Sequence, residues 1–214
     1  MIGIVDYGMG NLHSVTKGLE RIGHSPFVSE KIEELEKASK IILPGVGSFR
    51  DGMRELKDRG LDTFLRDWAE TGRPLLGICL GMQLLFEESE ENGPTTGLSL
   101  LPGHVVRFPG KTSTGQAYKV PHMGWNRLKF QQPDHPILQE VPTGHVYFVH
   151  SYVVNAAESV LVASTEYGDQ LVPAVVGRNN VWGTQFHPEK SSVLGMQMLR
   201  NFANVVEVDQ EVAK

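Results

Sequence analysis

The chain contains very little cysteine: Cys79 is the only one among its 214 residues. A single thiol excludes an intramolecular disulfide and any zinc or iron–sulfur site built on several cysteines, and it is typical of a reducing compartment. Long apolar segments are also absent, because the longest nearly unbroken run, from Leu75 to Phe86, is far shorter than the roughly 20 residues that span a bilayer. The first residues lack the basic region of a signal peptide. Together these observations predict a cytoplasmic protein.

Basic clusters and nucleotide motifs are lacking as well. The net charge is -5 and no stretch gathers Lys and Arg, which argues against a nucleic-acid binder. No phosphate-binding G-x-x-x-x-G-K-[ST] motif occurs, and no histidine pair has the spacing of metal ligands on a helix, so we expect neither a metal nor a cofactor. "DYGMGNLHS" has a G-x-G pattern after a strand, but His13 replaces its third glycine. This is a weak dinucleotide signal, and a tight turn is the other interpretation.

The two halves of the sequence differ in how apolar runs and helical patterns follow one another. Up to Gly93, the runs "IGIVDY", "PFVS", "KIILPG" and "PLLGIC" alternate with helical patterns over residues 11–22, 51–72 (interrupted near Gly60) and 80–91. This alternation predicts an α/β fold with a doubly wound, mostly parallel central sheet. The second half consists of short β-type runs such as "HVYFVHSYVV", which predict a more antiparallel part, followed by a helix over 192–206. We expect a single domain, 1–214, with a frayed tail over 206–214.

Cys79 lies in "GICLG", between an apolar run and a helical segment. A nucleophile elbow has this pattern: the nucleophile sits on a sharp strand-to-helix turn, and small residues such as Gly77 and Gly81 let the backbones approach. A helix beginning at Leu80 would favour the thiolate and offer its N–H to an oxyanion. Free cysteine is also among the most often buried residue types. The elbow alone therefore leaves a core cysteine as an equal alternative.

"WGTQFHPEKS" supplies a base and a group to orient it. His187 follows a β-run, so we expect it at the same sheet edge as Cys79. Glu189 is two positions further on, where an extended segment directs both side chains to one side, and Pro188 favours extension. "ILPGVGSF", residues 42–49, ends another strand in a glycine-rich turn whose N–H groups could face an oxyanion. Read alone, the His187–Glu189 segment could equally be a surface turn, and residues 42–49 could equally be a plain strand-to-helix connection.

These motifs, together with "DYGMGNLHSV", "VPHMGWN" and "YFVHSYVV", resemble the class I (triad) glutamine amidotransferases over residues 2–205. The last three are similar to one branch of that family, the glutaminase subunits of imidazole glycerol phosphate synthase. The resemblance implies a flavodoxin-like glutaminase domain. It also implies that Cys79 attacks the glutamine carboxamide, that His187 transfers protons, and that Glu189 orients the imidazole, after which water hydrolyses the thioester.

The resemblance implies further residues. The oxyanion hole would use Leu80 with Val46 or Gly47, and the substrate would contact Gln83, Ser151 and Tyr152. The alternative interpretation of Gln83 is a polar residue on a helix surface, and that of Ser151 and Tyr152 is an ordinary strand position. Segments near the partner contain four residues that could equally be plain surface positions: Asn11, Met123, Trp125 and Lys190.

The resemblance also implies a partner. In a heterodimer, a (β/α)8-barrel cyclase subunit would use the ammonia in a lyase reaction of histidine biosynthesis. The products would be imidazole glycerol phosphate and an aminoimidazole carboxamide ribonucleotide. Other interpretations are a glutaminase serving pyridoxal phosphate or anthranilate synthesis, a non-catalytic binding protein on the same scaffold, and a cysteine peptidase.

Overall fold

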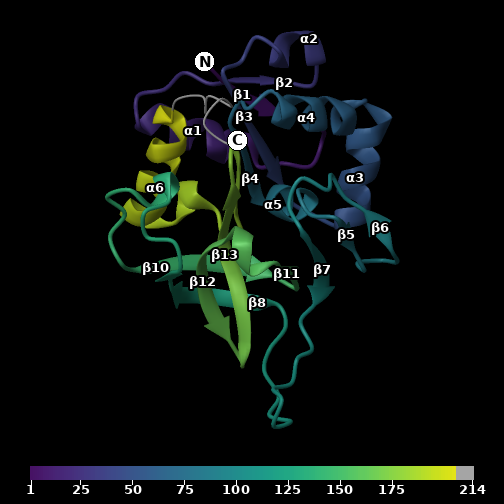
Figure 1. Cartoon of the computed structure of the whole chain (residues 1–214), viewed down its shortest axis with the longest axis vertical. Helices are drawn as coiled ribbons and strands as arrows, with labels where there is room; N and C mark the ends of the chain where they lie inside the picture. The colour runs from purple at the N-terminus through teal and green to yellow at the C-terminus, as the bar shows by residue number, and fades with distance from the viewer. Residues whose placement is uncertain (206–214) are drawn as a thin grey trace.

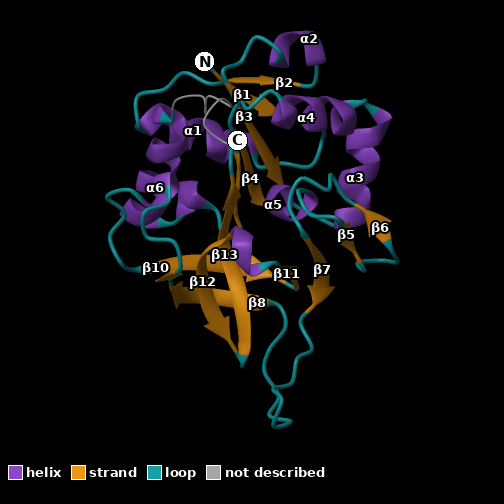
Figure 2. Ribbon diagram, viewed as in Figure 1, coloured by secondary structure: helices purple, strands orange, loops and turns teal. Residues whose placement is uncertain are grey.

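The computed structural model describes residues 1–205, and its central feature is an eight-stranded sheet (Figures 1 and 2). Five neighbouring strands are parallel, in the order β2 (Phe27–Ser29), β1 (Ile2–Val5), β3 (Lys40–Gly45), β4 (Leu75–Cys79) and β14 (Val181–Thr184). Three antiparallel strands follow: β13 (Gln170–Arg178), β12 (Leu161–Tyr167) and β9 (Lys129–Phe130). The predicted α/β fold, with a more antiparallel C-terminal half, is confirmed. The predicted tail, 206–214, lies outside the described residues.

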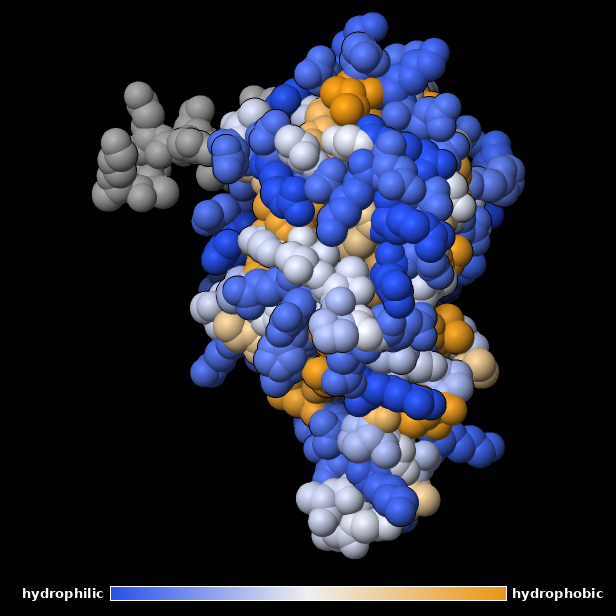
Figure 3. Space-filling model, turned by 90° about the vertical axis from the view of Figure 1, so that its right-hand side faces the viewer, coloured by the Kyte–Doolittle hydropathy of each residue, from blue (hydrophilic) through white to orange (hydrophobic). Residues whose placement is uncertain are grey.

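Helices cover both faces of the parallel part of the sheet (Figure 1). On one face lie α1 (Leu12–Arg21) and α6 (Ser192–Asn204); on the other lie α2 (Ile32–Leu35), α3 (Phe49–Asp58), α4 (Leu61–Glu70) and α5 (Leu80–Leu84). Successive strand residues point to opposite faces, so Ile4 packs in one apolar core and Val5 in the other. The outside is mostly hydrophilic, with small, separate apolar patches on the face in Figure 3. Within residues 1–205, no helix is long and apolar enough to cross a membrane.

Two smaller sheets complete the fold. One pairs β10 (His145–His150) with β8 (His122–Arg127); the other has the order β11 (Tyr152–Ala156), β7 (Gly103–Arg107), β5 (Glu88–Ser89) and β6 (Thr95–Thr96). Short 3₁₀ turns are η1 (Pro136–Leu138), η2 (Glu158–Val160) and η3 (Pro188–Lys190). The run predicted as one strand, "HVYFVHSYVV", is therefore two strands in different sheets, and Ser151 separates them.

The helix predicted over 80–91 is much shorter in the structure, where α5 ends at Leu84. The carbonyl of Leu85, which a longer helix would use internally, instead accepts the N–H groups of Leu100 and Leu101. Leu85 and Phe86 are fully buried, so tertiary packing overrides the local helical pattern. The predicted interruption near Gly60 is confirmed, because this residue is left-handed (φ 68°) between α3 and α4.

Candidate active site

Cys79 occupies a strained turn between β4 and α5. Its φ of 57° and ψ of -114° form a conformation that residues other than glycine rarely adopt, and α5 begins at the next residue. The glycines on either side have no room for a side chain. A Cβ at Gly77 would lie 2.6 Å from the carbonyl oxygen of Gly81, and a Cβ at Gly81 would overlap that of Leu43. The close backbone contact that the G-x-C-x-G spacing predicts is therefore present.

His187 lies at the same edge of the sheet as Cys79 because β14 runs parallel to β4, with Thr184 opposite Ile78. The side chain of Glu189 reaches it: His187 Nδ1 is 2.9 Å from Glu189 Oε1. The predicted extended segment between them is wrong. Pro188–Lys190 form the 3₁₀ turn η3, with Pro188 in its first turn, and this turn brings the carboxylate back to the ring.

The surroundings of His187 favour its protonated form. Burial opposes the charge, but the interactions with the Cys79 sulfur and with the Glu189 carboxylate outweigh it and raise the pKa of His187 to about 9. Glu189 is almost fully buried, and its second oxygen, Oε2, has no hydrogen-bond partner in the described part of the chain. At neutral pH an imidazolium therefore lies between a buried carboxylate and the sulfur.

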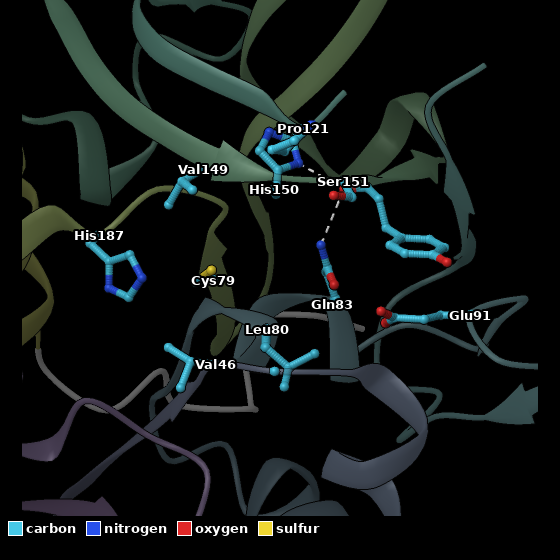
Figure 4. A pocket seen from close by; sticks show the side chains of 12 residues that line it. Val46, Cys79, Leu80, Gln83, Glu91, Pro121, Val149, His150, Ser151 and His187 are labelled. Carbon is cyan, nitrogen blue, oxygen red and sulfur yellow. Dashed lines mark hydrogen bonds between the residues drawn. The ribbon is translucent and has the colours of Figure 1, made fainter. Parts of the chain in front are cut away.

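A pocket of about 360 Å³ opens above Cys79 (Figure 4). Figure 4 shows His187 and Gln83 on opposite sides of the sulfur. The pocket contains every residue predicted for the oxyanion hole and the substrate contacts, together with two members of the predicted triad: Val46, Gly47, Leu80, Gln83, Ser151, Tyr152, Cys79 and His187. Segments far apart in the sequence thus converge at the end of the parallel strands, where α/β sheets bind ligands.

The predicted oxyanion donors differ in availability. The N–H of Leu80 is at the first position of α5, where a helix supplies no acceptor. The N–H of Val46 donates to the carbonyl of Met9 at 2.8 Å, so in this structure it does not face an oxyanion. Gly47 is left-handed (φ 104°), and its N–H has no protein acceptor among residues 1–205. Of the predicted donors, Leu80 and Gly47 are available and Val46 is not.

Gln83 is buried, so its interpretation as a residue on a helix surface is wrong. Its side-chain nitrogen, Nε2, donates to the carbonyl of Tyr152 at 3.3 Å and to Oε1 of Gln185 at 3.0 Å. Because both of these groups accept, the orientation of the Gln83 amide is determined. Its oxygen, Oε1, is the atom that remains for a ligand in the pocket.

Glu91 also lines the pocket, although no motif in the sequence predicts it. Its carboxylate accepts the N–H of Phe49 at 2.7 Å. Burial raises the pKa of Glu91, an effect that the hydrogen bond from Phe49 opposes and the nearby Asp51 reinforces. In the sequence it is one of several acids in "EESEENG", and nothing in the pattern distinguishes it from its neighbours.

The residues predicted near the partner lie outside this pocket. Met123 and Trp125 project from β8 with 58% and 55% of their surface exposed, and Val149, opposite Met123 on β10, is 43% exposed. Lys190 is an exposed residue of η3. Asn11 has a structural role, since its side chain accepts the N–H of Ser14 and caps α1.

The two remaining sequence signals concern ligands. The G-x-G segment forms a tight turn between β1 and α1, in which Asp6 Oδ1 accepts the N–H of Gly8 at 3.0 Å. Over residues 1–205, no group of three or more His, Cys, Asp or Glu side chains is arranged to hold a metal ion.

Comparisons with solved structures identify the fold. A crystal structure of a glutamine amidotransferase aligns with a TM-score of 0.72 and 22% identity, covering 94% of this chain and 96% of that one. PurLQS from Thermotoga maritima aligns with a TM-score of 0.70 and 20% identity, covering 95% and 97%. At these identities the likeness concerns the fold alone.

Sequence comparisons identify the family. The family described as glutamine amidotransferase class-I matches residues 3–206. Imidazole glycerol phosphate synthase subunit HisH from Halalkalibacterium halodurans is 64% identical over 208 residues, 97% of each chain. The protein of the same name from Bacillus subtilis is 55% identical over 215 aligned positions, covering both chains completely. This chain therefore belongs to the class I glutamine amidotransferases and, within them, to the HisH subunits of imidazole glycerol phosphate synthase.

Proposed function

We propose that this chain hydrolyses glutamine to glutamate and ammonia and passes the ammonia to a cyclase subunit of imidazole glycerol phosphate synthase, in histidine biosynthesis. The observation that carries the proposal is the pocket in which Cys79 faces His187, with Glu189 behind the imidazole. The names of these two HisH relatives support the choice of imidazole glycerol phosphate synthase over the synthases for pyridoxal phosphate or anthranilate. We further propose that the chain acts as a single glutaminase domain.

In the proposed reaction the Cys79 sulfur attacks the side-chain carboxamide carbon of glutamine and forms a tetrahedral oxyanion. The imidazolium of His187 donates a proton to the departing nitrogen, and ammonia leaves as the carbon–nitrogen bond breaks. His187, now neutral, takes a proton from water while the water oxygen attacks the thioester carbon, and glutamate is released as the thiolate re-forms. Glu189 holds the imidazole so that Nε2 faces the sulfur.

The pocket offers a separate group for each part of the substrate. The N–H groups of Leu80 and Gly47 would bind the oxyanion, since neither has a competing acceptor in the part of the chain that the structure describes. Oε1 of Gln83 and the carboxylate of Glu91 would bind the α-ammonium group, which needs acceptors. The backbone at Ser151 and Tyr152 would hold the rest of the amino-acid end.

Val46 gives a reason why the chain would be slow on its own. Its N–H is bonded to the carbonyl of Met9, so it can join the N–H groups of Leu80 and Gly47 as a third oxyanion donor only after this bond opens. Met9 lies two residues before Asn11, in the segment that we expect near the partner. We propose that docking of the partner moves this segment and frees Val46. Loss of one oxyanion donor typically costs about 100- to 1,000-fold in rate, so activation of that order is expected.

The proposed partner is a (β/α)8-barrel cyclase subunit, and the lyase step belongs to that subunit rather than to this chain. Met123, Trp125 and Val149 form an exposed apolar patch on the antiparallel strand pair β8–β10, and Val149 also lines the pocket. Such a patch supports a docking role, because its burial excludes water from an apolar surface. Asn11 and Lys190 would extend the contact. A cytoplasmic location stays a prediction.

Glutamate release from glutamine tests the proposal, measured for the chain alone and after mixing with the cyclase subunit and an analogue of its nucleotide substrate. We expect low activity alone and a strong increase in the mixture. The Cys79→Ala variant should release no glutamate yet bind the cyclase as wild type does. Activity that survives this substitution would contradict the role of Cys79. A wild-type complex that forms but releases no glutamate would favour the non-catalytic interpretation.

A further inference from the structure

The turn that carries Glu189 lies between two helices. η3 contacts both α1 and α6, which cover the same face of the sheet (Figure 1). Each of these helices has a buried glycine in its interior, Gly18 in α1 and Gly195 in α6. Glycine is unfavourable inside a helix compared with alanine, so its presence at both positions requires an explanation from the packing.

Both glycines face η3. A Cβ at Gly18 would lie 2.8 Å from the Cβ of Glu189 and 3.6 Å from its Cα. A Cβ at Gly195 would overlap the carbonyl oxygen of Pro188 and lie 2.8 Å from its Cα. These atoms belong to the backbone or to the root of a side chain, so no flexible end can turn aside. The turn therefore fills the space between two helix backbones, and a methyl group on either side would displace it.

The hydrogen bonds of the turn determine its shape. The N–H groups of Lys190 and Ser191 donate to the carbonyls of His187 and Pro188, at 3.0 and 3.1 Å. Ser191 Oγ also donates to the carbonyl of His187, at 2.8 Å. All of these bonds lie within the turn, so they do not determine how far it lies from α1. That distance depends on the packing against the helix.

Glu189 depends on this packing because a hydrogen bond holds only one of its oxygens. Oε1 lies 2.9 Å from His187 Nδ1, whereas Oε2 has no partner among residues 1–205. With a single partner, the position of the carboxylate follows that of the Cα and Cβ atoms of Glu189. These are the two atoms that a Cβ at Gly18 would meet.

We propose that Gly18 and Gly195 are positioning residues: by leaving room for η3 between α1 and α6, they place the Glu189 carboxylate against His187. This inference rests on the proposed function, in which Glu189 orients the imidazole. Burial opposes the protonated form of His187, while Cys79 and Glu189 favour it and raise the pKa to about 9. A displaced carboxylate favours it less, so displacement of the turn should lower the pKa of His187.

Gly18→Ala and Gly195→Ala test the inference, with Gly52→Ala as the control. Gly52 also lies inside a helix, α3, but a Cβ there meets only the ends of leucine side chains. An NMR titration of the chain alone should give a lower pKa for His187 in the two test variants than in the control and wild type. The alkaline limb of kcat in the cyclase complex should move to lower pH with it.

The expected loss of activity follows from the displacement. An ordinary contact begins at 3.4 Å, so Gly18→Ala must move the turn or the helix by about 0.6 Å. A displacement near 1 Å costs about 100-fold in rate, so kcat should fall roughly tenfold, with little change in KM. If Gly18 acts through Glu189, Gly18→Ala should lower kcat no further in the Glu189→Gln background, because coupled residues are not additive.

A variant whose His187 pKa and kcat match those of Gly52→Ala would overturn the inference for that glycine, even if it unfolds more easily. Such a result would indicate ordinary core packing. Full additivity of Gly18→Ala and Glu189→Gln would also overturn it. A wild-type complex without glutaminase activity would instead contradict the proposed function, and the titration needs no turnover.

Hydrogen exchange of the wild-type chain needs no variant to fold. If the two helices hold η3 in place, the N–H of Ser191 should exchange as slowly as that of Leu199, a fully buried residue of α6. Exchange at Ser191 that is tenfold faster or more would show that the turn opens while the helices stay folded, and it would overturn the inference.

Discussion

Replacing Gly81 by alanine should damage both stability and catalysis. The added Cβ would overlap the carbonyl oxygen of Leu43 and lie 2.8 Å from its carbon, and the carbonyl carbon of Pro44 would be 3.3 Å away. These are backbone atoms of a central strand, so no side chain can turn aside and α5 must move away from β3. Overpacking of this kind costs about 1–3 kcal/mol, and we expect the upper end, reduced by the roughly 1 kcal/mol that alanine gains over glycine in a helix.

The activity should fall further than the stability. Cys79 directly precedes α5, so a shift of this helix moves the sulfur relative to His187. A displacement near 1 Å at a reacting atom costs about 100-fold in rate. Urea unfolding and glutamate release by the activated complex measure the two effects.

Gly52→Ala is the matched control for this substitution. Gly52 lies inside α3, and a Cβ there meets the ends of the Leu84 side chain at 3.2 and 3.3 Å, which can adjust. We expect a stability between unchanged and about 1 kcal/mol higher, with full activity. If Gly81→Ala were as stable and active as Gly52→Ala, the reasoning about the elbow would be refuted.

Three further predictions concern electrostatics and docking. Glu189→Gln removes a carboxylate that raises the pKa of His187, so an NMR titration should place this pKa below the wild-type value of about 9. Because the folded-state pKa of His187 is raised, its protonation stabilises the fold fully below pH 6.5, and this contribution is lost as the pH rises through about 9. Between these pH values the wild type should therefore lose more stability than Glu189→Gln. Equal losses would contradict the assigned interaction between His187 and Glu189. Glu91→Gln should raise KM for glutamine at least about tenfold, because a charged acceptor is lost, and an unchanged KM would remove Glu91 from the proposed binding site. Trp125→Ala, at a side chain 55% exposed, should weaken cyclase binding about tenfold or more in calorimetry without lowering the unfolding midpoint.

Short motifs were sufficient to predict that Cys79 and His187 come together in one pocket. Cys79 ends β4, and His187 lies three residues after β14 ends at Thr184; because β4 and β14 are parallel neighbours, the shared edge follows from strand direction alone. The contact between His187 and Glu189 was predicted for the wrong backbone reason: the motif identifies the pair, but the 3₁₀ turn depends on how Pro188 starts it. Spacing alone was therefore informative where the local geometry was not.

The residues that sequence reasoning missed depend on tertiary contacts. Glu91 enters the pocket because the chain turns back after Leu84, and this turn is determined by hydrogen bonds to Leu85 from residues far along the sequence. The bond from Val46 to Met9 likewise joins two loops that no pattern connects. His122 and His150 are buried opposite each other by the pairing of β8 with β10, which periodicity alone does not reveal.

The position of Ser151 between two sheets has a mechanical consequence. β10 belongs with β8, β11 belongs with β7, and the chain passes from one sheet to the other through this residue, which also lines the pocket. Any rigid displacement of the β8–β10 strand pair relative to β7 and β11 must be taken up by the two backbone torsions of Ser151 and its neighbouring peptides. A movement of the β8–β10 strand pair therefore changes the backbone conformation at the glutamine pocket directly. A glycine inserted after Ser151 would add flexible backbone between the two sheets, and the pocket would then no longer follow the position of the strand pair.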